Sequence, residues 1–286
     1  MSISVALSGC GTPPRETDRR FANYVLNYDT ARDPRLQPAL EAIDMKLRTQ
    51  LGMAPEQTSV GLLDLKQLRL ALIHPDEIEY AASIPKIGIL LAYFELNPSA
   101  VTNLDPTVRH ELGLMIKISS NEMAAKYSQQ LGLGRIQQVL DKYHFYDAAH
   151  GGGIWVGKHY GLDIERIGDP IGNNSHAATV RQLLRFYLLM EQGKLVSAEG
   201  SKRMLEIFES PDIPHDPIKF IKGLAGRPEL RIIRKSGTWE DWLHDTAEVA
   251  GPHRRYILVA LTKHPKGDEY LEGLAREVDD LMATLR

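Results

Sequence analysis

The sequence SIPKIGILLAYF, residues 83–94, contains the feature that most constrains the fold. After the opening Ser-x-x-Lys, apolar side chains occupy every side of a predicted helix over residues 87–94, and a helix without a polar face is buried. Pro85 suits the first turn of a helix, where no backbone donor is lost. The spacing therefore predicts a helix that starts at Ser83 and carries Ser83 and Lys86 on one face.

A lysine at the entrance of a buried helix is partly desolvated, which lowers its pKa and permits a neutral amine. A neutral Lys86 could accept the proton of the Ser83 hydroxyl, and the N-terminus of the helix favours negative charge nearby. The alternative is purely structural: Ser83 caps the helix, and Lys86 extends its ammonium along apolar surface into water. This string alone does not separate the two interpretations.

A second polar string, Ser119-Ser120-Asn121, follows a predicted apolar helix. A serine-rich break between two helices is commonly a capping turn. The functional alternative gives Ser119 the role of a proton relay and Asn121 an amide that contacts the substrate. The string itself favours neither interpretation.

A third string, Lys235-Ser236-Gly237, comes directly after a predicted strand and is expected to end it. Lys235 would attract a carboxylate and Ser236 would donate a hydrogen bond to it. Gly237 would let a ligand approach the backbone. The N–H of Thr238 could pair with that of Ser83 as an oxyanion hole. The structural alternative is a strand that ends in an ordinary turn.

The rest of the chain predicts two lobes. Apolar periodicity and turn signals indicate an α/β (α+β) fold in which terminal helices cover one face of a five-stranded sheet and a mostly helical insertion forms the second lobe. The predicted helices cover residues 36–51 and 270–285, the predicted strands cover 59–65, 68–73, 230–233, 246–249 and 256–262, and the insertion runs from about 76 to 210. The predicted domains are a tail over 1–34 and a catalytic domain over 35–286, with 35–75 and 212–286 in the sheet lobe and 76–211 in the helical lobe.

Composition excludes several classes of function. The chain of 286 residues is 43% hydrophobic and 25% charged, which is ordinary for a globular protein that buries a large core. A net charge of −3 gives no basic field for nucleic acid. No run approaches the roughly 18 apolar residues that span a bilayer. His110-Glu111 lacks the second histidine of a zinc motif, and no glycine-rich phosphate loop is present, so we expect neither metal nor cofactor.

The single cysteine, Cys10, ends the string Leu7-Ser8-Gly9-Cys10, which resembles a bacterial lipobox. A lipobox cysteine is lipidated and becomes the mature N-terminus, and the polar residues beyond it would form a tether. The apolar stretch before it is short and no Lys or Arg precedes it. The sequence is thus compatible with a truncated lipoprotein signal, which implies export to the periplasm or a membrane anchor, and with an accidental match in a disordered terminus.

Together, the three ordered strings resemble the serine β-lactamase and penicillin-binding protein superfamily, closest to its class A β-lactamase-like branch. The resemblance runs from about residue 35 to the C-terminus. It implies that Ser83 is the acylated nucleophile, Lys86 its base and Ser119 the proton shuttle to the leaving nitrogen. It further implies that Asn121 binds the acyl side chain, whereas Lys235 and Ser236 hold the substrate carboxylate.

This chain departs from the class A pattern in four ways. Ser120 replaces an aspartate, Ser236 replaces a threonine, and only 36 positions separate Ser83 from Ser119. The fourth departure is the absence of E-x-x-L-N, whose glutamate activates the deacylating water in class A enzymes. The matching stretch, residues 155–175, offers Glu165 as a weak substitute by analogy.

The resemblance implies a serine hydrolase that forms an acyl-enzyme with a β-lactam or a related amide or ester. An alternative is a penicillin-binding or cell-wall sensor module that is acylated without efficient turnover, because the missing base could slow hydrolysis by roughly 10²–10⁴-fold. A third possibility is a scaffold that uses the cleft for a partner protein. For the first two, the partner is a small β-lactam or peptidoglycan-like molecule, and a monomer is expected.

Overall fold

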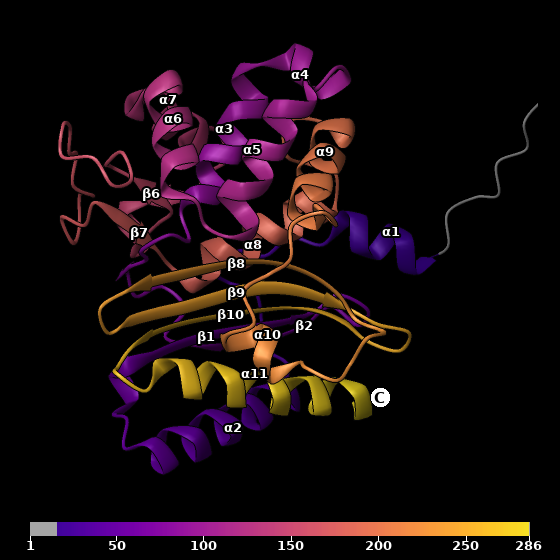
Figure 1. Ribbon diagram of the computed structural model, residues 1–286. Helices are drawn as coiled ribbons and strands as arrows, with labels where there is room; N and C mark the ends of the chain where they lie inside the picture. The colour runs from indigo at the N-terminus through magenta and orange to yellow at the C-terminus, as the bar shows by residue number, and fades with distance from the viewer. Residues whose placement is uncertain (1–15, 286) are drawn as a thin grey trace, which may run out of the picture.

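A five-stranded antiparallel sheet lies between two layers of helices in the computed structural model, which describes residues 16–285 (Figure 1). The strand order is β2-β1-β10-β9-β8, so the strands on either side of the insertion pair with one another through β1 and β10. This arrangement confirms the predicted sheet. The strands are β1 (Thr58–Asp64), β2 (Arg69–Ile73), β8 (Arg231–Trp239), β9 (Trp242–Ala250) and β10 (Arg255–Lys263).

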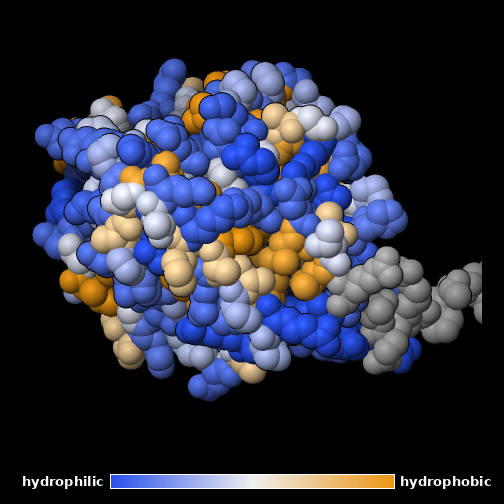
Figure 2. All heavy atoms as spheres, turned by 90° about the horizontal axis from the view of Figure 1, so that it is seen from below, coloured by the Kyte–Doolittle hydropathy of each residue, from blue (hydrophilic) through white to orange (hydrophobic). Residues whose placement is uncertain are grey.

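Two terminal helices cover one face of this sheet, as predicted. α2 (Leu36–Leu51) and α11 (Gly267–Thr284) pack against each other and against the sheet, together with the short α10 (Lys219–Gly223). Gly52 ends α2 in the left-handed region, with φ of 73°. From below (Figure 2), the outer surface of this layer is mostly hydrophilic, and exposed apolar side chains gather in a central strip.

The opposite face of the sheet packs on α8 (Val180–Glu191), which lies over β1 and β10. Gly61 on β1 permits this close approach, because a Cβ at that position would lie 2.5 Å from Val180 Cγ1 and 2.7 Å from Leu184 Cδ1. α8 joins the sheet to the helical lobe, so the two lobes share one apolar core.

The helical lobe is built around α3, whose residues 86–94 are all buried, as the sequence predicts for a helix without a polar face. The insertion is mostly helical, as predicted, but the expectation of an all-helical lobe does not hold, because the stretch from 143 to 179 contains short strands and a single 3-10 turn and no α-helix. The elements of the lobe are α3 (Lys86–Leu96), α4 (Pro98–Thr102), α5 (Pro106–Lys117), α6 (Asn121–Leu131), α7 (Leu133–Lys142) and α9 (Ala198–Glu209), with strands β3 (Glu79–Tyr80), β4 (Tyr146–Asp147), β5 (Gly152–Gly153), β6 (Trp155–Val156) and β7 (His176–Ala178). The short strands pair in two small sheets, in which β7 lies between β3 and β6, and β4 pairs with β5.

Two predicted boundaries near the key strings differ from the structure. α3 begins at Lys86 rather than Ser83, because the chain reaches it through a tight turn in which Ala82 has φ of 47°. β8 continues to Trp239, so the Lys235-Ser236-Gly237 string lies within the strand instead of ending it. The strand is longer because β8 pairs with β9 along its whole length, up to the Trp239–Trp242 pair.

The predicted tail, residues 1–34, also ends earlier than expected. α1 (Glu16–Asn23) precedes a segment that packs on the domain: Leu26 is 2% exposed, and Asn27 O accepts a hydrogen bond of 2.8 Å from Arg181 Nη1. The residues from about 24 onward therefore belong to the folded domain. Cys10 and its lipobox-like string lie outside the described residues. Within residues 16–285, no helix combines the length and hydropathy of a membrane span.

Candidate active site

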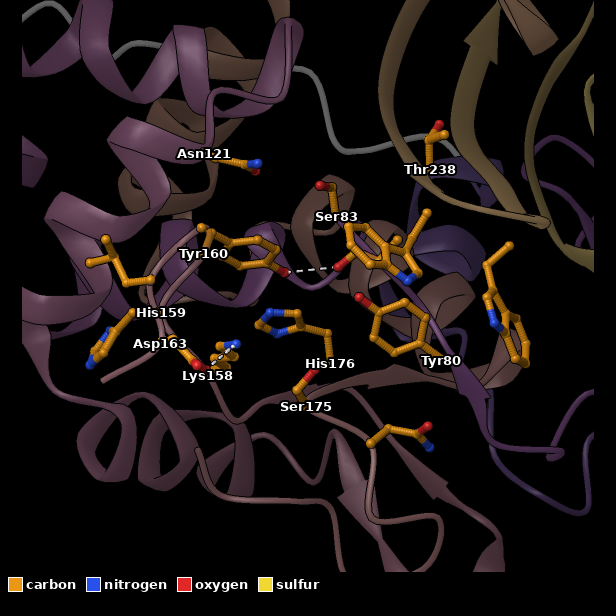
Figure 3. Close-up of a pocket in the computed structure, with 16 residues that line it drawn as sticks. Tyr80, Ser83, Asn121, Lys158, His159, Tyr160, Asp163, Ser175, His176 and Thr238 are labelled. Carbon is orange, nitrogen blue, oxygen red and sulfur yellow. Dashed lines mark hydrogen bonds and ion pairs between the residues drawn. The ribbon is translucent and has the colours of Figure 1, made fainter. Parts of the chain in front are cut away.

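A cleft of about 660 Å³ lies where the helical lobe meets the β8–β9 end of the sheet. Figure 3 shows Ser83 in this cleft between Asn121, at the start of α6, and Thr238, on β8. One residue of the first string, one of the second and the residue that follows the third therefore face one cavity. The other residues that line it are Tyr80, Ala82, Lys158, His159, Tyr160, Gly161, Leu162, Asp163, Asn174, Ser175, His176, Trp239 and Trp242.

Lys86 is fully buried beside the cleft, and its amine contacts the second string. Nζ lies 2.6 Å from the backbone oxygen of Ser119 and 2.7 Å from Asn121 Oδ1, both of which are acceptors. It also lies 3.2 Å from Ser119 Oγ. Burial lowers the pKa of Lys86 from the ordinary 10.5 to about 7, so a large neutral fraction is present near neutral pH.

The Ser119 hydroxyl bridges two buried lysines. Its Oγ accepts a hydrogen bond of 2.8 Å from Lys235 Nζ, in addition to its contact with Lys86 Nζ. Ser119 has φ of 61°, which is strained for a serine and turns the chain so that α6 starts next to α3. Ser120 is the N-cap of α6, since its Oγ accepts from Met123 N. The string is thus both a capping turn and the meeting point of the two amines.

Lys235 is fully buried, and its ammonium is directed inside the protein. Besides Ser119 Oγ, Nζ contacts the backbone oxygen of Ser236 at 2.6 Å. Burial, followed by the positive charges of Lys86 and Arg234, lowers its pKa well below the ordinary value. Neither Lys235 nor Ser236 is among the residues that line the cleft. In this arrangement Lys235 influences the cleft through Ser119.

Strand β8 approaches the Ser83 turn at Gly237. A Cβ at this position would lie 2.8 Å from Ala81 O and 3.2 Å from Ser83 N, so the contact requires glycine. The close approach brings the backbone of Ser83 beside that of Thr238, the predicted pair of oxyanion donors. The Ser83 hydroxyl makes no hydrogen bond within residues 16–285, and it is free to reorient.

Comparison with protein-family models gives one match, described as the β-lactamase enzyme family, over residues 98–282. That match covers well over half of the chain. The chain belongs to the β-lactamase enzyme family. Membership in this family supports a serine hydrolase. A search of curated proteins found no match.

Several solved structures are similar to this chain in fold. A β-lactamase from Sphaerobacter thermophilus DSM 20745 is similar at 13% identity, with a TM-score of 0.69, over 87% of this chain and 98% of that one. PBP-A is similar at 18% identity, with a TM-score of 0.64, over 85% and 97%. A class A β-lactamase from Mycobacterium abscessus is similar at 16% identity, with a TM-score of 0.65, over 85% and 98%.

The carboxylates of residues 155–175 of this β-lactamase family member have other partners in the structure. Glu165 is not among the cleft-lining residues; its Oε2 lies 3.4 Å from His159 Nε2 and its side chain is half exposed. Asp163 lines the cleft but pairs with Lys158 at 2.9 Å. Asp169 accepts hydrogen bonds from three backbone N–H groups of its own loop. The geometry therefore disfavours the suggested role of Glu165 as a deacylation base.

An aromatic stack lies beside the amine of Lys86, and the sequence analysis missed it. The Tyr160 ring lies with its centroid 4.5 Å from Lys86 Nζ and stacks on His176 at 4.0 Å with an interplanar angle of 2° (Figure 3). The Tyr160 hydroxyl donates to Ala82 O at 3.1 Å, directly before Ser83. Burial lowers the pKa of His176 to about 3, so that its ring is neutral. No sequence pattern identifies Tyr160 or His176. Only the path of the 155–175 loop, which leads into β7, places the two rings beside Lys86.

Replacement of Tyr160 by phenylalanine is expected to slow acylation about fivefold while the protein stays folded. The change keeps the ring over Lys86 but removes the hydroxyl that holds the strained Ala82 carbonyl, a hydrogen bond of about 1 kcal/mol. The check is the rate of acylation by a penicillin, measured by stopped-flow or mass spectrometry. Tyr146→Phe, which removes a hydroxyl that donates to Asp169 outside the cleft, is the matched control and should acylate at the parent rate. Equal rates for Tyr160→Phe and the parent would contradict the assignment.

Proposed function

We propose that this protein is a serine hydrolase that attacks a β-lactam or a related amide or ester through Ser83 and forms an acyl-enzyme. The observation that carries the proposal is the convergence of two buried amines, those of Lys86 and Lys235, on the hydroxyl of Ser119 beside a cleft that contains Ser83. A purely structural capping turn does not require two desolvated lysines, which cost free energy to bury.

The contacts of Lys86 suit a general base. A neutral amine has two N–H donors and one lone pair; Ser119 O and Asn121 Oδ1 take the two donors. The lone pair then faces the third contact of the amine, the Ser119 hydroxyl at 3.2 Å, and becomes available to Ser83 when that hydroxyl reorients. In acylation the Ser83 oxygen bonds to the substrate carbonyl carbon while its proton passes to Lys86. The backbone N–H groups of Ser83 and Thr238 stabilise the oxyanion that forms.

Collapse of this intermediate breaks the carbon–nitrogen bond of the substrate, and the leaving nitrogen requires a proton. Ser119 is suited to supply it, because its hydroxyl is hydrogen-bonded to both amines. The proton that Lys86 took from Ser83 then returns through Ser119, with Lys235 stabilising the negative charge on the transferring oxygen. The suggested role of Lys235 and Ser236 in holding a substrate carboxylate is not part of this proposal, because neither residue lines the cleft.

Hydrolysis of the acyl-enzyme is proposed to be slow. Asp163, Glu165 and Asp169 are the carboxylates of the 155–175 loop, and each is paired or hydrogen-bonded elsewhere. The Tyr160 ring instead fills the space beside Lys86. Without a positioned base, water attacks the ester slowly. This observation favours the second candidate function, a penicillin-binding or cell-wall sensor module that stays acylated.

The test uses the whole protein, a penicillin and a chromogenic cephalosporin. Intact-mass analysis after incubation with penicillin is expected to show one adduct of the penicillin's mass, and cephalosporin turnover is expected to be about 10²–10⁴-fold slower than with an efficient general base. A persistent adduct supports the sensor, and an adduct with rapid turnover supports the hydrolase and contradicts slow deacylation. Absence of both adduct and turnover would contradict acylation and leave a scaffold.

Export belongs to the same proposal, because the substrates of this chemistry lie outside the bacterial cytoplasm. Cys10 is the proposed lipid attachment site, and the polar residues after it would link the anchor to the folded domain. Expression of the whole chain in a bacterial host with radiolabelled palmitate tests this point. Label that disappears in Cys10→Ala supports the anchor, whereas an unlabelled parent protein contradicts it.

A further inference from the structure

Lys219 is a buried lysine that lies outside the cleft. Its side chain is fully buried, and its backbone has φ of 52° at the first position of α10. A lysine in the left-handed region is uncommon, and a buried ammonium is costly unless its donors are satisfied. It is not among the residues that line the cleft. The position therefore calls for an explanation other than direct contact with substrate.

The ammonium of Lys219 is bound to strand β8 at the residues that follow Ser236. Nζ donates to Gly237 O at 2.7 Å and to Thr238 Oγ1 at 2.7 Å. A third, longer contact of 3.4 Å goes to the backbone oxygen of His244 on β9. Asp268 Oδ1 lies 3.8 Å away and supplies a counter-charge. All three donors of an ammonium are thus used, which stabilises the charged form against burial.

The Gly237 carbonyl and the Thr238 N–H belong to one peptide group. A cation at the carbonyl oxygen draws electron density from the nitrogen, which makes the N–H a stronger donor on the other side of the peptide. We propose that Lys219 strengthens the oxyanion hole by polarising the Gly237–Thr238 peptide. Lys219 is then a positioning residue: it acts on the reaction only through the Thr238 N–H. The inference rests on the proposed function for its catalytic consequence.

The competing interpretation is that the hydrogen bonds of Lys219 only stabilise the position of β8. Both interpretations predict a loss of stability when the lysine is removed, but only polarisation predicts a change in the electronic state of the Thr238 N–H. Asp245 and Asp268 oppose the lowering of the Lys219 pKa that burial causes, which is consistent with a resident charge at this position.

The experiment compares Lys219→Met, which keeps the length and removes the charge, with Lys222→Met as a matched control. Lys222 lies on the same short helix, is 63% exposed and pairs with Glu272. In the free protein, the amide proton resonance of Thr238 is expected to move upfield in Lys219→Met and to stay in place in Lys222→Met. In the penicillin acyl-enzyme of Lys219→Met, the infrared band of the ester carbonyl is expected to move to higher wavenumber. Acylation is expected to slow about 3–10-fold, which is less than the rate loss caused by removing a whole oxyanion donor.

An unchanged Thr238 resonance and an unchanged carbonyl band in folded Lys219→Met would overturn the proposal. If this variant does not fold, Lys219→Arg, which keeps the cation, and Asp268→Asn, which removes its counter-charge, provide the comparison. In the arginine variant the Thr238 amide resonance should stay downfield, as in the parent. An upfield shift of this resonance as large as that expected for a neutral side chain at position 219 would contradict the role of the charge. A parent protein that forms no adduct contradicts the proposed function, whereas the resonance of the free protein still tests polarisation.

Discussion

Replacement of Ser83 by alanine is expected to abolish the covalent adduct with penicillin and any turnover of a chromogenic cephalosporin. Among the serine hydroxyls of the three strings, only that of Ser83 lies in the cleft, next to the predicted oxyanion donors. Loss of a nucleophilic serine lowers the rate of a serine hydrolase on the order of 10⁶-fold, which is below detection in both assays. The measurement is intact mass after prolonged incubation with excess penicillin.

Ser120→Ala is the matched control for this prediction. Ser120 belongs to the second string, but its hydroxyl caps α6 by accepting from Met123 N at 3.2 Å. Its loss should cost about 1 kcal/mol of stability and leave the adduct intact. A persistent adduct in Ser83→Ala would mean that another nucleophile is acylated, with Ser119 as the first residue to map by peptide mass spectrometry.

The order of the three strings and their resemblance to a known family predict the convergence, because no single string separates its functional from its structural interpretation. The apolar run after Lys86 can only be a buried helix, and the nearly apolar run of β10 can only be a central strand. With these two elements in place, Ser119 and Lys235 meet between the lobes, where Lys235 Nζ lies 2.8 Å from Ser119 Oγ. Their mutual contacts follow from packing, because buried amines must find acceptors.

The rest of the site could not be predicted because it depends on backbone paths that no periodicity encodes. Tyr160 lies under Lys86 only because the non-helical stretch from 143 to 179 folds back against α6. Lys219 follows a proline-rich segment and has the sequence context of a solvated loop, yet a single left-handed residue turns its side chain into the protein. Positive φ at a residue other than glycine has no reliable sequence signal.

The length of β8 had a signal that was missed. Trp239 and Trp242 flank Glu240-Asp241, and aromatic residues on both sides of a short polar turn are typical of a hairpin. Treating Gly237 as the end of the strand ignored that a glycine also permits close approach between backbones inside a sheet. The correct boundary matters for the chemistry, because a strand holds the Thr238 N–H in a fixed direction whereas a turn would not.

The acylation rate is expected to rise with pH through about 7 and then to level off. Only the neutral amine of Lys86 can accept the Ser83 proton, and burial lowers the pKa of Lys86 to about 7. Below that pH the ammonium has no lone pair, so the rate falls about tenfold per pH unit; above it the base is fully available. The measurement is the second-order acylation rate constant between pH 5 and 9.

The same profile distinguishes Lys86 from other buried amines. Lys86→Met is expected to lower the rate about 10²–10⁴-fold and to remove the step near pH 7, because both the base and its titration are lost. Lys117→Met is the matched control: that lysine is also buried, but its Nζ donates to Glu209 O and not to the Ser119 and Asn121 oxygens that Lys86 contacts. Its variant should keep the step at the same pH. If the acylation rate of Lys86→Met still rises through pH 7, the titrating group is not Lys86. The two amines around Ser119 would then have a role in binding rather than in proton transfer.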